Sequence, residues 1–163
     1  LQTLRVNSAG TDLEYAGFVS TDISARVYNN ANISIPNAAH TVITFNTEVF
    51  DTDTIHSLVS NTGRLTATTA GKYIITGMVV WASHATGNRV LTLRLNGVTD
   101  IGKVQQQTVA EAGYDTIQNV TILFSLAAAD YVELQGFQSS GAALNVVQTN
   151  DYGISFSMVK VLG

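Results

Sequence analysis

The chain has 163 residues, a length that suits one domain with a sizeable core. Only 12% of the residues are charged, the net charge is −4, and the eight Lys and Arg residues are scattered, which excludes a basic surface for nucleic acid. Cysteine is absent, which excludes disulfides and thiolate metal sites, and no apolar run approaches the ~20 residues of a membrane-spanning helix.

The first segment, residues 1–22, is predicted to be a hairpin or linker. Two short strands, LQTLRV and DLEYA, flank a turn at 7–10, and a junction follows at 18–22. Because a two-stranded hairpin is marginally stable alone, we expect it to pack against another copy of the chain or against chain upstream of Leu1. The sequence thus predicts an N-terminal hairpin or linker at 1–22 and a head domain at 23–163.

The head domain is predicted to begin with short strands separated by turn residues. Strands are expected at 23–29, 33–35 and 41–45, and Pro36, the only proline, ends the second of them. Residues 48–53 are expected to lead into a polar loop, 57–61 is weakly strand-like, and a short strand within 63–69 precedes a turn.

The strand expected at 72–82 is central to the prediction, because both of its faces are apolar. One face carries Tyr73, Ile75, Val79 and Trp81, and the other carries Ile74, Met78, Val80 and Ala82. A strand with one face in water alternates apolar and polar residues instead. We expect the first face to lie on the core and the second to be covered by another copy of the chain.

The remaining strands follow at regular intervals. They are expected at 90–95, 98–107, 116–126, 131–138, 144–148 and 152–162, and Asn96-Gly97 is expected to close a hairpin between the first two. The only helix-compatible stretch, 109–113, is predicted to be a loop. About ten strands without a helix predict an all-β fold, a single β-sandwich or jelly roll.

Several stretches, in the same order along the chain, resemble the globular head of complement component one-q and the tumour-necrosis-factor-like jelly rolls. They are NTGRLT at 61–66 with AGKY at 70–73, LRLNG at 93–97, ADYVEL at 129–134 and YGISFSM at 152–158. The resemblance implies a homotrimer around a three-fold axis, at the tip of a longer trimeric stalk. The chain departs from the family at Ala129, where glycine is usual, and lacks the cysteine pair of many animal members.

The leading segment, LRVNSAGTDLEY at 4–15, resembles linkers in tail and fibre proteins of bacterial viruses. That resemblance implies a virion protein whose N-terminal segment meets other virion proteins.

Two sets of residues are candidates for assembly and recognition. The apolar residues expected on the second face of 72–82 and on 116–126 are predicted to form the trimer interface: Ile74, Met78, Val80, Ile117 and Leu123. Polar residues on the expected loop tips are predicted to contact a host cell-surface glycan or protein: Ser83, His84, Asn88, Gln105, Tyr114, Ser139 and Ser140.

The sequence FDTDTIH contains a weak candidate metal site. Asp51, Asp53 and His56 have the side chains that divalent cations bind, but an acidic loop with local turn hydrogen bonds explains the same pattern. No nucleophile elbow or phosphate-binding loop occurs, so we expect no catalytic site and no cofactor.

The sequence therefore favours a non-enzymatic trimeric head of a bacteriophage fibre or surface appendage, which recognises the host or decorates the virion. The alternative is a ligand-binding head of a secreted or surface-attached cellular protein. A glycan hydrolase carried on a fibre is the third reading.

Overall fold

Strands make up the regular structure of the residues that the computed structural model describes, which are 2–6, 9–11, 13–17, 22–108, 114–149 and 153–161. The turn residues 7–8, the junction 18–21 and the stretch 109–113 lie outside these described residues. The strands are β1 (Gln2–Val6), β2 (Leu13–Gly17), β3 (Ser24–Tyr28), β4 (Ile33–Ile35), β5 (Thr41–Val42), β6 (Thr47–Asp51), β7 (Arg64–Thr66), β8 (Gly71–Trp81), β9 (Asn88–Leu95), β10 (Thr99–Gln107), β11 (Thr116–Leu126), β12 (Tyr131–Gln138), β13 (Leu144–Val146) and β14 (Ile154–Lys160).

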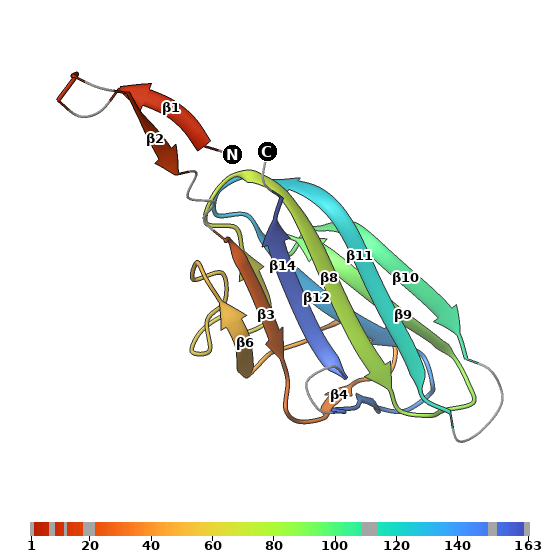
Figure 1. Cartoon of the computed structure of the whole chain (residues 1–163). Helices are drawn as coiled ribbons and strands as arrows, with labels where there is room; N and C mark the ends of the chain where they lie inside the picture. Colours follow the sequence, from red (N-terminus) through yellow and green to blue (C-terminus); the bar gives the residue numbers. More distant parts are fainter. Residues whose placement is uncertain are drawn as a thin grey trace.

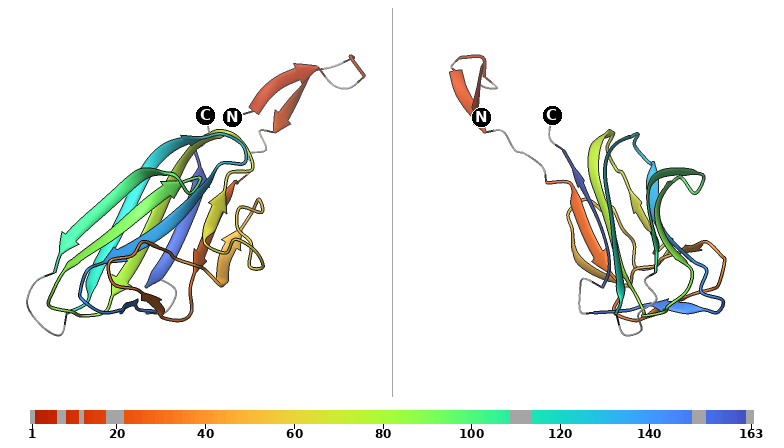
Figure 2. Two further views of the ribbon diagram at one scale, coloured as in Figure 1. Left: turned by 180° about the vertical axis from the view of Figure 1, so that it is seen from behind. Right: turned by 90° about the vertical axis from the view of Figure 1, so that its right-hand side faces the viewer.

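From β3 onward the strands form two antiparallel sheets that pack face to face (Figures 1 and 2). The seven-stranded sheet has the order β4-β13-β8-β14-β3-β6, with β11 paired to β8. The five-stranded sheet has the order β10-β9-β12-β5, with β7 paired to β12. Consecutive strands often lie in different sheets, so the structure is the jelly-roll sandwich that the strand pattern predicts.

The core lies between the sheets, and strand periodicity decides which residues enter it. Side chains two residues apart share a face of a strand, so the predicted inward set on β8 is buried together. Tyr73, Ile75, Val79 and Trp81 are all fully buried. The opposite sheet supplies buried residues at the same period: Leu65, Leu91, Leu93, Val132 and Leu134.

The hairpin at Asn96-Gly97 forms as predicted. Both residues have positive φ, 51° and 68°, which is the conformation that favours Asn-Gly in tight hairpins. β9 and β10 pair on either side of this turn, and the register shifts between Asp100 and Gly102.

Three local predictions differ from the structure. Residues 57–61 form a loop rather than a strand, because the Ser57 hydroxyl accepts hydrogen bonds from the amides of Val59 and Ser60, and Asn61 has a φ of 52°. The strand expected at 41–45 is regular only over β5. Residues 48–53 are predicted to lead into a polar loop, but residues 47–51 form β6 at the edge of the seven-stranded sheet.

The chain enters and leaves the sandwich at the same end. The amide of Lys160 donates to the carbonyl of Ile23 at 2.9 Å, so the start of β3 lies beside the end of β14. The loops between β8 and β9 and between β12 and β13 lie at the opposite end, which we call the distal end (Figure 1).

The leading segment forms the expected antiparallel hairpin of β1 and β2, in which Leu4 pairs with Tyr15. Among the described residues, no helix is long and apolar enough to cross a bilayer.

Candidate functional site

The outward face of the seven-stranded sheet carries a row of exposed apolar side chains. The register places Leu123 opposite Ile74, and Ile74 opposite Val159, so the three residues lie side by side on β11, β8 and β14. Their exposed fractions are 61%, 42% and 40%. We call these three residues the apolar row. A cluster of large apolar side chains on a surface is typical of a site that meets a partner.

Further along the same face, the predicted interface residues behave differently from one another. Ile117 is 62% exposed, but Val80, which lies opposite it, is only 3% exposed. The backbone of Val80 forms hydrogen bonds with other segments of the same chain. Its amide donates to the carbonyl of Gly153 at 2.8 Å, and its carbonyl accepts from the amide of Val147 at 2.7 Å. The prediction that Val80 presents surface to another subunit is therefore not supported by its burial.

Polar residues separate the two apolar regions of this face. The hydroxyls of Thr76 and Thr121 lie 3.0 Å apart, and Thr121 also donates to the side chain of Asn119. Met78 lies opposite Asn119 and is half-buried. The face thus presents an apolar row, a central polar band, and Ile117 beyond it.

The distal end brings several predicted recognition residues together. Two hydrogen bonds join Asn88 and Ser139. The backbone amide of Asn88 donates to the Ser139 hydroxyl at 2.9 Å, and the backbone amide of Ser139 donates to the backbone carbonyl of Asn88 at 3.2 Å. The Thr86 hydroxyl donates to the carbonyl of Ser140 at 3.2 Å. The exposed ring of His84 accepts a hydrogen bond from the Thr86 amide. The loops 83–88 and 139–143 therefore form one surface.

The other predicted recognition residues lie at its border. The Ser83 amide donates to the Asp115 carboxylate at 3.0 Å, which ties the loop to the start of β11. Tyr114 is exposed beside this contact, next to the stretch 109–113 that lies outside the described residues. Gln105 is exposed but lies on β10 rather than on a loop.

A buried polar cluster supports the distal loops from beneath. Arg89 is fully buried, and its guanidinium donates to the carbonyls of His84, Thr86 and Asn88 at 3.1 to 3.4 Å. Gln118 links it to Trp81: the Trp81 indole donates to the Gln118 side chain at 2.9 Å, and that side chain donates to the Arg89 carbonyl at 3.0 Å.

Burial lowers the pKa of the Arg89 guanidinium, because removal from water disfavours its charged form. None of the described carboxylates forms an ion pair with it. Sequence reasoning missed this cluster, since a lone arginine beside a strand is normally a surface residue.

The candidate metal residues are engaged in hydrogen bonds within the chain. The Asp51 carboxylate accepts from the amides of Asp53, Ile55 and His56 at 2.8 to 3.1 Å, as expected of an acidic turn. The buried His56 ring places Nδ1 2.9 Å from Glu48 and Nε2 3.1 Å from the Thr62 carbonyl. Asp53 accepts from the Thr68 hydroxyl. The described residues contain no group of three side chains arranged to hold a metal ion.

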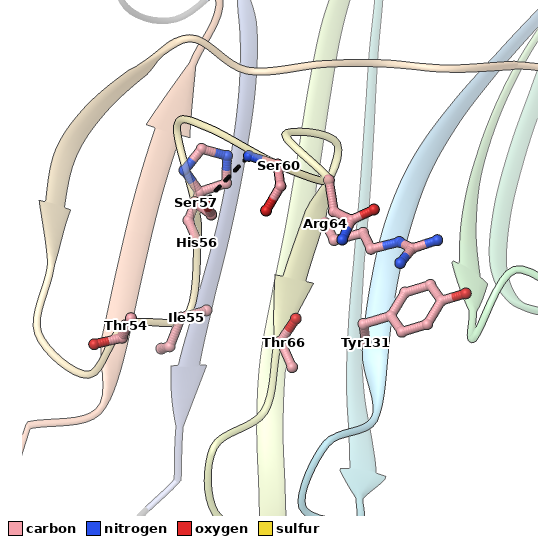
Figure 3. A pocket seen from close by; sticks show the side chains of 9 residues that line it. Thr54, Ile55, His56, Ser57, Ser60, Arg64, Thr66 and Tyr131 are labelled. Atoms are coloured by element: carbon pink, nitrogen blue, oxygen red, sulfur yellow. Dashed lines mark hydrogen bonds between the residues drawn. The ribbon is translucent and has the colours of Figure 1, made fainter.

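A hollow beside β7 and β12 was not predicted from the sequence (Figure 3). It has a volume of about 340 Å³ and is lined by residues of the loop 54–61 together with Arg64, Thr66 and Tyr131. A second hollow of about 320 Å³ adjoins it and shares Asn61 and Arg64. β7 and β12 are far apart in the sequence, so only their pairing assembles this surface.

Arg64 is held in place by residues of β12. Its Nε donates to the Glu133 carboxylate at 2.8 Å, and its guanidinium carbon lies 3.9 Å above the Tyr131 ring. The hydrogen bond to Glu133 raises the pKa of Arg64. The sheet register explains both contacts, because Arg64 is directly opposite Glu133 and diagonal to Tyr131.

Comparisons with known proteins identify the fold. No family model and no curated protein matches the sequence. Among solved structures, murine APRIL, crystallised at pH 5.0, matches with a TM-score of 0.63 at 12% identity, over 86% of this chain and 99% of that chain. Eiger TNF from S. frugiperda matches with a TM-score of 0.61 at 13% identity, over 87% of this chain and 94% of that chain. The predicted jelly roll of tumour-necrosis-factor type is thus confirmed.

Proposed function

We propose that the chain is a non-enzymatic head domain that assembles as a homotrimer through the outward face of its seven-stranded sheet. The observation that carries this proposal is the apolar row of Leu123, Ile74 and Val159, which remains partly exposed in the single subunit. The face on which it lies belongs to the sheet that contains both chain ends of the sandwich. Contact with a second copy would remove these side chains from water.

The energetic gain from such a contact is appreciable. Complete burial of a Val, Leu or Ile side chain stabilises by roughly 1.5–3 kcal/mol, and these residues already have part of their surface covered. The apolar row and Ile117 together would therefore contribute on the order of several kcal/mol at each interface, before the cost of association. A closed trimer forms three such interfaces, and the polar band of Thr76 and Thr121 supplies hydroxyls that can pair across them.

The two ends of the sandwich have different surfaces, which supports a role as the tip of a stalk. The N-terminal hairpin joins the end where β3 begins, whereas the joined loops 83–88 and 139–143 lie at the distal end. A stalk attached at the first end would present the second to a partner. We therefore infer that the distal surface contacts a host cell-surface glycan or protein.

The resemblance of the leading segment to bacteriophage fibre linkers favours a virion location and attachment to other virion proteins through that segment. The second candidate is a ligand-binding head of a secreted or surface-attached cellular protein. It is favoured by the fold similarity to murine APRIL and to Eiger TNF from S. frugiperda. Neighbouring genes for capsid, portal or tail proteins would favour the first candidate, and their absence from the locus would favour the second.

The decisive experiment introduces a charge into the apolar row. Leu123→Asp should convert a trimer into monomers, measured by multi-angle light scattering, because a carboxylate cannot be buried unpaired at the interface. Val98→Asp is the matched control, since Val98 is an exposed apolar residue on the β9–β10 hairpin. Circular dichroism should show that both variants remain folded. A monomeric wild type, or a soluble trimer of Leu123→Asp, would overturn the proposed interface.

The absence of catalysis is tested separately. Glycans that bind the wild-type protein on an array should be recovered intact after prolonged incubation. Release of shorter products, detected by mass spectrometry, would show instead that the head is a hydrolase.

A further inference from the structure

The two hollows adjoin each other at Arg64 and Asn61, and we call them together the lateral groove. Its volumes of about 340 and 320 Å³ are each at the lower end of the range for small-molecule sites. Arg64 and Asn61 form the wall between them. Figure 3 shows Arg64 extended over Tyr131, with Ser57 and Ser60 on the neighbouring loop. Two adjoining hollows suit a ligand with at least two linked units.

The charge of the groove is balanced, but hydrogen-bond donors remain free. Glu133 accepts from Nε of Arg64 and compensates its charge. The terminal nitrogens of the same guanidinium donate to none of the residues described, and the side chain is 32% exposed. A carboxylate or phosphate ligand would meet the Glu133 charge, whereas a neutral ligand with hydroxyl groups can accept from the free donors.

The facing loop offers further polar groups of the same kind. In the described part of the chain, the side-chain amide of Asn61 and the hydroxyl of Ser60 have no hydrogen-bond partner. The loop that carries them is held in shape: the Ser57 hydroxyl accepts from the Ser60 amide at 3.3 Å, and the Arg64 amide donates to the Asn61 carbonyl at 3.0 Å. A fixed set of hydroxyl, amide and guanidinium groups can bind a polar ligand at a low cost in ordering.

We propose that the lateral groove binds a neutral oligosaccharide. Sugar hydroxyls both donate and accept, so they match the mixed donors and acceptors of Arg64, Asn61 and Ser60, and the edge of Tyr131 adds an apolar surface for a sugar ring. The groove is built on the five-stranded sheet, while the apolar row is on the other sheet. The site therefore lies on a different sheet from the apolar row, and it is distinct from the distal loops.

The test is an NMR titration of the ¹⁵N-labelled full chain with defined probes. The neutral probes are maltotriose, N-acetyllactosamine and triacetylchitotriose, and the acidic probe is a trimer of galacturonic acid. At least one neutral probe should shift the amide signals of residues 57–66 and of Tyr131, and should do so more strongly than the acidic probe.

Two variants and one control locate the binding. Asn61→Gly tolerates the positive φ of 52° but removes the side-chain amide. Arg64→Lys keeps the positive charge that faces Glu133 but removes the forked N–H donors of the guanidinium. Each should weaken binding about tenfold, the effect of one lost hydrogen bond of ordinary strength. The control, Lys103→Ala, changes an exposed residue on the edge strand β10 and should leave binding unchanged.

Three results would overturn the proposal: no neutral probe binds at millimolar concentration, the acidic probe binds more tightly, or Lys103→Ala weakens binding as much as Asn61→Gly and Arg64→Lys do. Light scattering on the same samples reports the oligomeric state, so a failure of the lateral groove is distinguishable from a failure of the proposed trimer.

Discussion

Gly77 lies where β8 faces the opposite sheet, and the structure predicts that an added methyl group there destabilises the protein. A Cβ at this position would contact both methyl groups of Leu134 and lie 3.2 Å from its Cγ. Leu134 is fully buried on β12, so its side chain cannot turn into solvent. Gly77→Ala must therefore displace core atoms.

Two opposing effects determine the magnitude. Replacing Gly by Ala inside a strand normally stabilises by roughly 0.5–1 kcal/mol, because glycine loses more backbone freedom on folding. Overpacking a well-filled core costs about 1–3 kcal/mol. Since the contacts at Leu134 are closer than ordinary van der Waals distances, the second effect should prevail. We expect Gly77→Ala to lower the free energy of unfolding by about 1–2 kcal/mol.

A double-mutant cycle tests the cause. Leu134→Ala alone should cost about 2–5 kcal/mol through the cavity that it leaves. Adding Gly77→Ala should cost nothing more, or restore stability, because the new methyl group enters that space. The measurement is urea unfolding followed by circular dichroism, at one fixed protein concentration because assembly also affects stability. A more stable Gly77→Ala, or strictly additive losses in the double mutant, would refute the packing argument.

Two further predictions concern the turns. The hydrogen bond from Asn96 holds the pKa of Asp130 below its usual 3.8. The charged carboxylate therefore stabilises the folded state fully above pH 3.8, and this stabilisation is lost as the pH falls through the pKa of the folded state. Thermal melts should therefore show Asp130→Asn less stable than wild type at pH 7, with the difference shrinking below pH 3.8; a constant difference would contradict this. Arg89→Met should speed amide hydrogen exchange in 84–88 about tenfold, by removing donors to three loop carbonyls, without affecting the β8–β11 pairs. Unchanged exchange there would show that the guanidinium does not hold the loop.

The long strands could be predicted from the sequence because their signal is local. The apolar alternation of 116–126 and 131–138 predicted β11 and β12 with the bounds that the structure has. The inward faces were also correct, since Ile154, Phe156 and Met158 of β14 are all buried as their spacing predicts. The short edge strands were predicted less well, because β5 and β6 contain few alternating residues and form through pairing with distant partners.

The candidate interface shows where sequence reasoning stops. Ile74, Ile117 and Leu123 were predicted to be apolar and outward, and all three are exposed. Val80 has the same period as Ile74, yet it is only 3% exposed. Its backbone forms hydrogen bonds with Val147 and Gly153, which are distant in the sequence, and the strand period does not predict those contacts. Likewise, Val159 joins the apolar row only through the register of β14 on β8.

The sequence alone determined which residues face inward and which outward along each long strand, because the two-residue period of a strand is a property of the chain itself. Only the tertiary structure decided which side chains meet. Arg64 meets Glu133 and Tyr131 through the pairing of β7 with β12, and Arg89 reaches the distal loop carbonyls by being buried beneath them. Such contacts depend on register and loop closure between distant segments, and side-chain periodicity carries no information about either.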